Sequence, residues 1–306
     1  MRLAGGRASR RWHWWERLGT MLRVGTALIA CLVITGCLYL MAHFVLDPNG
    51  AEGWTVGRRP NQFLGVVDHE QRVFSDEAYG AIFGVAHNSG GSIEATLEAR
   101  IQGADVIEVD VVAIDGNLYS AHDPPLPFIG QRWFRGPRLE RVWAASYGAD
   151  AVALDLKEDD PEFVELVTEF LLSRTTQRQV IVSSRSVGVL EYLHQRSPET
   201  VLLLSVPDER GLAAVVRSPS LLDVIDGITV RHTVLTEENT DWLNSHGLLI
   251  FAWTVNDIGR ANELIRMGVD GITSDNLGLV SLFGGDAGNE RSLRPAPETE
   301  MDGPDE

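Results

Sequence analysis

The chain has 306 residues, of which 44% are hydrophobic and 23% charged, so it can bury the core of one large domain or two smaller ones. Its formal net charge of −17 argues against nucleic acid as a partner, because phosphate backbones bind basic surfaces. Both cysteines, Cys31 and Cys37, lie in an N-terminal apolar segment, which excludes a disulfide framework, a zinc–cysteine cluster and a cysteine nucleophile from the rest of the chain.

The N-terminal apolar segment predicts a membrane anchor. Residues 24–46 contain no Asp, Glu, Lys or Arg and are long enough to span a bilayer as a transmembrane helix. The basic residues 1–23 precede them, so the positive-inside rule predicts a single-pass protein of the cell membrane with its main domain outside the cytoplasm. Two alternatives remain: the "ITGC" that ends at Cys37 resembles a lipoprotein cleavage box, and a cleaved signal peptide would give a secreted protein.

Two polar segments flank the predicted main domain. Residues 47–75 contain scattered Gly and Pro and are predicted to form a tether. Residues 285–306 are acidic, contain Pro and lack aromatic residues, which predicts disorder. The domain itself is therefore expected over residues 76–284.

Short β-branched segments alternate with amphipathic segments of helical length through this domain. Strands are predicted at residues 82–88, 105–112, 151–157, 179–184, 200–206, 226–231, 248–255 and 270–274. After the first strand, apolar residues recur at helical spacing at Ile93, Leu97, Ile101 and Ala104, and Gly268 is placed to end a later helix. This alternation predicts a closed (β/α)₈ TIM barrel; an open doubly wound sheet is the alternative, but no Gly-rich dinucleotide turn follows the first strand.

Three acidic residues are predicted at the carboxyl ends of two of these strands. Glu108 and Asp110 share one face of the second strand because side chains alternate, and Asp155 lies on the third. In a TIM barrel these strand ends meet at the rim that carries the active site. Carboxylates crowded there repel one another unless a cation holds them, and an all-oxygen site favours Mg²⁺ or Ca²⁺ over zinc. The alternative is that Glu108 and Asp110 are surface acids or partners of arginines.

Two histidines and a lysine are predicted at the same rim. His87 ends the first strand, and a hairpin turn at 115–116 returns the chain to His122. Either histidine alone suits a structural role, but two beside a metal site suit a general acid and a general base. Lys157 is the only lysine among 26 basic residues and suits contact with a phosphate oxygen; pairing with a neighbouring acid is the alternative. Together these groups predict hydrolysis or transfer at a phosphodiester.

The remaining histidines and one tryptophan have weaker contexts. His69, His194 and His246 are predicted to lie on the surface, whereas His232 follows the sixth strand and is a candidate for the pocket wall. Trp253, near the end of the seventh strand, belongs either to the pocket wall or to the core.

The segment "HNSGGSIEATLEARIQGADVIEVDVVAIDGNLYSAHDPPL", residues 87–126, resembles the glycerophosphodiester phosphodiesterase family. Further matches follow in the family's order at "ALDLK" (153–157), "FAWTVN" (251–256) and "MGVDGITSDN" (267–276). The resemblance implies a TIM barrel that uses one divalent cation to cleave glycerophosphodiesters to glycerol phosphate and an alcohol. Its substrate would be a small phosphodiester.

The resemblance also implies roles for individual residues by their position in these motifs. His87 and His122 would be the acid–base pair. The metal ligands would be Glu108, Asp110 and Asp155. The phosphate or substrate contacts would be Lys157, Asn88 and Trp253.

Two departures from the family pattern leave the substrate's head group open. Asn88 stands where the family has arginine, and Asp155 shortens the third carboxylate, as in the related sphingomyelinase D branch. The alternatives are therefore a phospholipase D or sphingomyelinase D-like activity on lysophospholipids, and a barrel that binds phosphoesters without catalysis. Residues 128–138 contain Arg132, Arg135 and Arg138 and are a candidate cap that supplies a replacement guanidinium; a solvated loop is the alternative.

Overall fold

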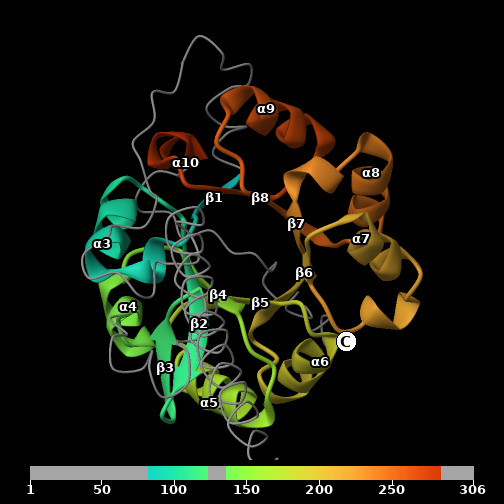
Figure 1. Ribbon diagram of the computed structural model, residues 1–306. Helices are drawn as coiled ribbons and strands as arrows, with labels where there is room; N and C mark the ends of the chain where they lie inside the picture. The colour runs from blue at the N-terminus through green and yellow to red at the C-terminus, as the bar shows by residue number, and fades with distance from the viewer. Residues whose placement is uncertain (1–81, 123–135, 284–306) are drawn as a thin grey trace, which may run out of the picture. The chain divides into compact units, whose positions relative to one another are not determined.

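The computed structural model describes residues 82–122 and 136–283 of this chain (Figure 1). The predicted membrane segment 24–46, the tether, the acidic tail, His69 and most of the arginine-rich segment 128–138 lie outside these residues. Over the part that is described, no helix has both the length and the apolar character needed to cross a bilayer.

Eight parallel strands form a closed barrel, which confirms the predicted TIM-barrel class (Figure 1). The strands are β1 Phe83–Ala86, β2 Val106–Ile114, β4 Ala151–Leu156, β5 Gln179–Ser184, β6 Val201–Val206, β7 Gly227–Arg231, β8 Leu249–Trp253 and β9 Gly271–Ser274. Each lies within or beside one predicted range. The ring closes because β1 pairs with both β2 and β9. The short strand β3, Asn117–Ser120, pairs antiparallel with β2 and forms the predicted hairpin at Asp115–Gly116.

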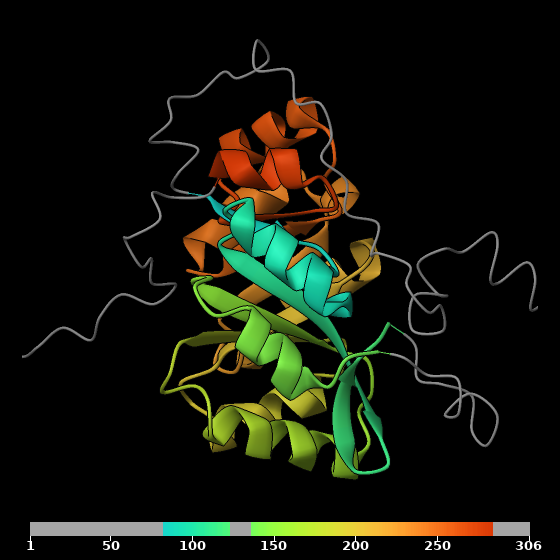
Figure 2. The same ribbon diagram turned by 90° about the vertical axis from the view of Figure 1, so that its left-hand side faces the viewer.

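Helices surround the barrel and connect successive parallel strands (Figures 1 and 2). They are α3 Ile93–Ile101, α4 Leu139–Ala145, α5 Pro161–Leu172, α6 Val187–Arg196, α7 Glu209–Val216, α8 Glu237–Ser245, α9 Ile258–Met267 and α10 Leu277–Phe283. Side-chain caps begin several of them, such as Asp160 on α5, and Gly268 ends α9 in the left-handed conformation as predicted. Apolar side chains between strands and helices form the main core.

The inner side of the barrel holds a second, smaller apolar cluster. Its buried members are Phe83, Val85, Val106, Ala151, Ile181, Val201, Leu203 and Phe251. They come from the amino-terminal halves of their strands or from the adjoining positions. The cluster therefore fills the barrel below its carboxyl-terminal mouth and leaves the mouth to other side chains.

The predicted apolar face of α3 is wrong in part. Ile101 is 75% exposed and Leu97 also faces solvent, whereas Ala95, Thr96 and Ala99 are buried. The small alanines let the helix approach the barrel closely, and the Thr96 hydroxyl is satisfied there because it donates to the carbonyl oxygens of Ser89 and Ser92. Figure 2 shows α3 (cyan) and α4 (green) on the outside of the barrel.

Candidate active site

Along β2 and β4 the inward-facing residues change from apolar to acidic toward the carboxyl end. On β2, Val106 belongs to the inner apolar cluster, and Glu108 and Asp110 follow it on the same face because strand side chains alternate. On β4, Ala151 belongs to that cluster and Asp155 follows at an even spacing. Asp110 and Asp155 are direct neighbours in the pairing of the two strands. The sheet itself therefore carries all three carboxylates to the mouth.

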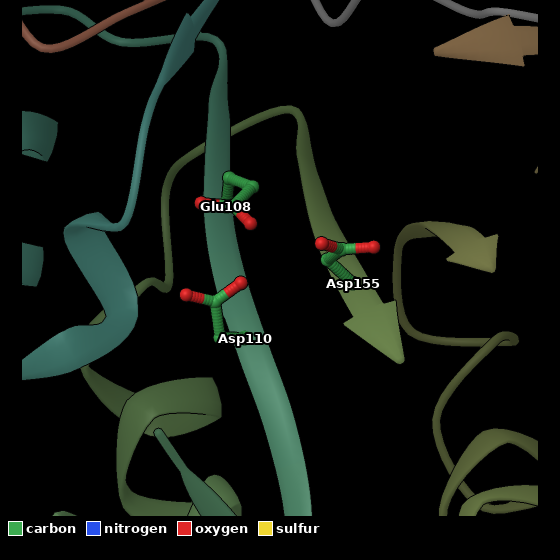
Figure 3. Close-up of side chains that lie close together, drawn as sticks. All are labelled: Glu108, Asp110 and Asp155. Atoms are coloured by element: carbon green, nitrogen blue, oxygen red, sulfur yellow. The ribbon is translucent and has the colours of Figure 1, made fainter. Parts of the chain in front are cut away.

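The three carboxylates lie close enough together to hold one metal ion. Glu108, Asp110 and Asp155 each offer an oxygen, and these oxygens lie within 4.8 Å of one another (Figure 3). Glu108 is 9% exposed and Asp110 is 2% exposed, so neither is a surface acid. A compact set of carboxylate oxygens is the donor set that Mg²⁺ and Ca²⁺ prefer. The site fits the predicted divalent cation.

Lys157 is already paired with two of these acids. Its Nζ lies 2.7 Å from Asp110 Oδ1 and also donates to Asp155 Oδ2. Burial lowers the pKa of Lys157, but the charges of Asp110 and Asp155 outweigh burial and raise the pKa above its ordinary value. Asp155 accepts a further hydrogen bond of 2.8 Å from the Ser183 hydroxyl on β5. The ammonium thus offsets part of the negative charge at the mouth.

Glu108 is held by the turn that follows β1. The backbone N–H of Asn88 donates to Glu108 Oε2, and Asn88 adopts the left-handed conformation with φ 51°. Asparagine tolerates that conformation better than most residues, which gives a physical reason for Asn88 at this position. Burial, followed by the charge of Asp110, raises the pKa of Glu108 to about 8. A cation bound there would compete with that proton.

The raised pKa values of Glu108 and His87 predict how the stability of the fold depends on pH. The pKa values of Glu108 and His87, about 8 and about 9, lie above their ordinary values, so the folded protein binds these protons more tightly than the unfolded chain. Stability is therefore lost as pH rises through these values, and we expect the thermal midpoint in EDTA to fall between about pH 6 and about pH 9. Mg²⁺ should raise the midpoint more at the alkaline end, because it replaces the proton on Glu108. Thermal melts with and without Mg²⁺ at matched ionic strength check this; equal shifts at both ends would contradict it.

Gly90, in the turn before α3, is packed directly against β2. A Cβ at this position would lie 2.3 Å from Val109 Cγ2 and 2.8 Å from Val109 Cβ, and Val109 separates Glu108 from Asp110. We expect Gly90→Ala to lower the free energy of unfolding by about 1–3 kcal/mol through overpacking. Because Val109 must shift, the affinity for Mg²⁺ should fall as well.

Chemical denaturation and calorimetric titration with Mg²⁺ measure these two effects of Gly90→Ala. Gly188→Ala is the matched control, since a Cβ on that residue of α6 would meet only the Ser186 hydroxyl at 4.0 Å. Unchanged stability and unchanged affinity in Gly90→Ala would show that β2 tolerates the extra methyl group.

His87 is oriented by a carboxylate that follows the neighbouring strand. Its Nδ1 lies 2.6 Å from Asp275 Oδ1, and Asp275 directly follows β9. Asn256, after β8, donates from Nδ2 to Asp275 Oδ2 at 2.9 Å and accepts from the Ser274 hydroxyl and the Asp275 N–H at 2.9 Å each. Both carboxylate oxygens of Asp275 are therefore engaged, and the His87 ring is fixed through Nδ1.

The same contacts set the charge of His87. Burial lowers the pKa of His87, but the hydrogen bond to Asp275 and the charges of Glu108, Asp275 and Asp110 together raise it to about 9. Burial raises the pKa of Asp275 in turn, but the hydrogen bond and the charge of His87, with the hydrogen bond from Asn256, together outweigh burial and lower that pKa overall. Sequence reasoning missed Asp275 and Asn256. Their signal was their place in "TSDN" and "WTVN", directly after two predicted strands and so at the same rim.

His122 lies in a pocket beside the acid cluster. It follows β3 and lines a pocket of about 320 Å³ together with Asp155 and Lys157. The strand order β1–β2–β4–β5 places His87 beside β2, whereas the pocket lies across the ends of β4 and β5. The structure thus places both histidines at the mouth, His87 beside β2 and His122 in this pocket.

Trp253 and His232 are not among the residues that line this pocket. Trp253 is the last residue of β8 and is partly buried. His232 accepts a hydrogen bond of 3.3 Å from Arg260 and does not line the pocket described above. His194 and His246 are exposed, as predicted.

The proposed arginine cap lies largely outside the described residues. Arg132 and Arg135 fall outside them. The guanidinium of Arg138 lies 5.8 Å from the ring centroid of Tyr119.

Comparisons with known proteins agree with this geometry. Residues 146–279 match the model of the "Glycerophosphoryl diester phosphodiesterase family". A segment of 48 residues, 16% of this chain, is 46% identical to the Bacillus subtilis (strain 168) protein YhdW, which carries the name of a glycerophosphodiester phosphodiesterase. That match spans a fifth of the length of this curated relative.

Solved structures resemble the fold. A phosphodiesterase from Oleispira antarctica in complex with the product sn-glycerol-3-phosphate aligns with a TM-score of 0.55 and 20% identity over 66% of this chain and 97% of that one. A glycerophosphodiester phosphodiesterase from Thermotoga maritima aligns with a TM-score of 0.51 and 20% identity over 65% of this chain and 96% of that one. At this identity the likeness shows the barrel fold. Residues 146–279 of the barrel are thus similar to the glycerophosphoryl diester phosphodiesterase family.

Proposed function

We propose that the barrel hydrolyses glycerophosphodiesters to glycerol phosphate and an alcohol with the help of one divalent cation. The observation that carries the proposal is the cluster of Glu108, Asp110 and Asp155, whose oxygens lie within 4.8 Å of one another beside Lys157. The match of residues 146–279 to the family model and the sn-glycerol-3-phosphate bound by the Oleispira antarctica phosphodiesterase support a substrate that contains glycerol phosphate.

Each group at the mouth has a task in this reaction. Glu108, Asp110 and Asp155 would hold Mg²⁺ or Ca²⁺, which stabilises charge on the phosphoryl oxygens when bound. Lys157, on the same rim, contacts a phosphoryl oxygen and orients the diester. His87 and His122 move the protons: one takes a proton from the nucleophile and the other gives one to the leaving oxygen.

Asp275 is a positioning residue in this scheme. Asp275 holds His87 through Nδ1, so we assign the proton exchange at the reacting phosphate to Nε2. Asn256 holds the second oxygen of Asp275, so the pair resists rotation. The arrangement is the general one in which a carboxylate fixes the tautomer of an acid–base histidine.

One assay separates this activity from its alternatives. The full chain in detergent is incubated with glycerophosphocholine or with lysophosphatidylcholine, in Mg²⁺, Ca²⁺ or EDTA, and free choline and glycerol phosphate are measured. The proposed activity gives both products from glycerophosphocholine and only with a metal. Choline released from lysophosphatidylcholine instead would assign a phospholipase D-type activity, and binding of either diester without products would assign a non-catalytic barrel.

We propose further that residues 24–46 anchor the chain in the cell membrane with the barrel outside the cytoplasm. The length of the uncharged segment and the arginines before it support this orientation. Protease treatment of intact cells and of opened cells tests it, with a cytoplasmic marker as control. Protection of the barrel in intact cells would contradict the orientation. Release of the barrel into the medium, or lipid attached to Cys37, would assign one of the two alternative processing routes.

A further inference from the structure

The pocket beside the acid cluster is larger than the cluster needs for a metal and a phosphate. It has a volume of about 320 Å³, which is within the range of small-ligand pockets. One wall consists of His122, Asp155 and Lys157, which belong to the proposed catalytic centre. Another part of the wall comes from the end of β5 and the segment after it, where Arg185 is the charged residue. A diester bound at the metal would therefore extend one of its two arms toward Arg185.

The acids of this pocket are largely engaged by other groups. Asp155 is held by Lys157 and by the Ser183 hydroxyl. Glu158 Oε1 accepts a hydrogen bond of 2.7 Å from the backbone N–H of Ala113. The third acid, Asp159, is exposed at the outer edge. The Lys157 ammonium therefore offsets the charge of Asp155, and Glu158 directs one carboxylate oxygen to the Ala113 N–H.

Arg185 differs from the other pocket cation in having its donors available. Lys157 is shared between two carboxylates, whereas the Arg185 side chain is exposed and forms no hydrogen bond or ion pair with any residue that the structure describes. The neighbouring Ser186 side chain makes no capping hydrogen bond to α6 and adds a hydroxyl to the same wall. A guanidinium has five N–H donors in a planar fork that matches a carboxylate or a phosphate.

Given the phosphodiesterase activity proposed above, we propose that Arg185 binds an anionic group on the alcohol arm of the substrate. The arm would carry a carboxylate or a second phosphate, and the barrel would prefer such diesters over those with a cationic or neutral arm. Ser186 would donate a further hydrogen bond to the same group. The fork would clamp the arm while the metal and Lys157 hold the phosphate that is cleaved.

Two diesters that differ in a single carboxylate test this preference. Glycerophosphoserine and glycerophosphoethanolamine share every other group, so the ratio of their kcat/KM values isolates the anion. For the full chain in detergent we expect a ratio of about ten or more in favour of glycerophosphoserine, as for a hydrogen-bonded charged group. In Arg185→Gln the ratio should collapse to about one, chiefly through a higher KM for glycerophosphoserine.

Arg210→Gln is the matched control. Arg210 is exposed in the first turn of α7, after the next strand of the barrel, and does not line the pocket. The Arg210→Gln substitution removes the same charge from the same rim, so it reports any effect of long-range electrostatics. The wild-type ratio should survive in Arg210→Gln.

Several outcomes would overturn the assignment. No preference for glycerophosphoserine in the wild type, or an equal loss of kcat/KM for both diesters in Arg185→Gln, would show that Arg185 does not bind the alcohol arm. An equal fall of the kcat/KM ratio in both arginine variants would show that the preference comes from the net charge of the rim and not from a contact with Arg185. If the wild type hydrolyses neither diester, the proposed function fails, and calorimetric affinities for the two diesters then test the Arg185 subsite by itself. The subsite is supported if the wild type prefers glycerophosphoserine and Arg185→Gln loses that preference. It is excluded if the wild type binds both diesters equally.

Discussion

Asp110→Asn is expected to lower kcat/KM for a glycerophosphodiester by about a thousandfold or more. Asp110 is 2% exposed, supplies one of the three clustered carboxylates and holds Lys157 at 2.7 Å. Asparagine keeps the shape of the side chain but carries no charge, so the substitution removes a metal ligand and releases the ammonium in one step. Charge stabilisation by a metal amounts to several kcal/mol, and each factor of ten in rate corresponds to about 1.4 kcal/mol.

Steady-state kinetics at saturating Mg²⁺ and calorimetric titration with Mg²⁺ measure the two parts of this effect. Asp115→Asn is the matched control, because Asp115 is exposed in the turn of the same hairpin and has φ 49°, a conformation that asparagine also tolerates. If Asp110→Asn kept the Mg²⁺ affinity and the kcat/KM of the wild type, the proposed role of a metal at this cluster would be excluded.

His87→Gln is expected to lower kcat by about 10²–10⁴-fold, the usual contribution of an acid–base residue. Glutamine keeps a polar group near Asp275 but cannot exchange a proton near neutral pH. Asp275→Asn should cause a smaller loss, because His87 remains but its orienting carboxylate becomes a neutral amide.

The positioning role of Asp275 can also be tested by a measurement that does not depend on activity. The hydrogen bond to Asp275 raises the pKa of His87, so Asp275→Asn should lower that pKa from about 9 toward its ordinary value. Histidine resonances followed by NMR in EDTA report this titration. The control is His194→Gln, on an exposed position of α6, which should leave kcat unchanged. A His87 titration that does not move in Asp275→Asn would exclude the positioning role.

The barrel could be predicted from the sequence because its signal is repeated eight times. Each strand is a short β-branched segment, and the alternation with helical segments leaves few architectures. The convergence of Glu108, Asp110 and Asp155 followed from the same reasoning: alternation fixes the face, and parallel strands bring their carboxyl ends to one rim.

Other features depend on contacts that no local pattern contains. Asp275 lies 188 residues from His87 in sequence and meets it only because β9 pairs with β1 to close the ring. In sequence it reads equally well as a residue that precedes a helix. On α3, hydrophobicity favoured Leu97 and Ile101, but the barrel selects the narrower stripe with Ala95 and Ala99. The size of a side chain decides such close approaches, and periodicity does not measure size.

The ammonium of Lys157 is a counterion that the chain carries with it. Unlike a dissolved ion, it is covalently part of the chain, so its supply beside Asp110 and Asp155 does not depend on the concentration of divalent metal. The mouth can therefore assemble during synthesis in surroundings poor in such ions. Binding of a divalent cation would then start catalysis in a barrel that is already folded. A shortage of that cation would stop catalysis without unfolding the barrel.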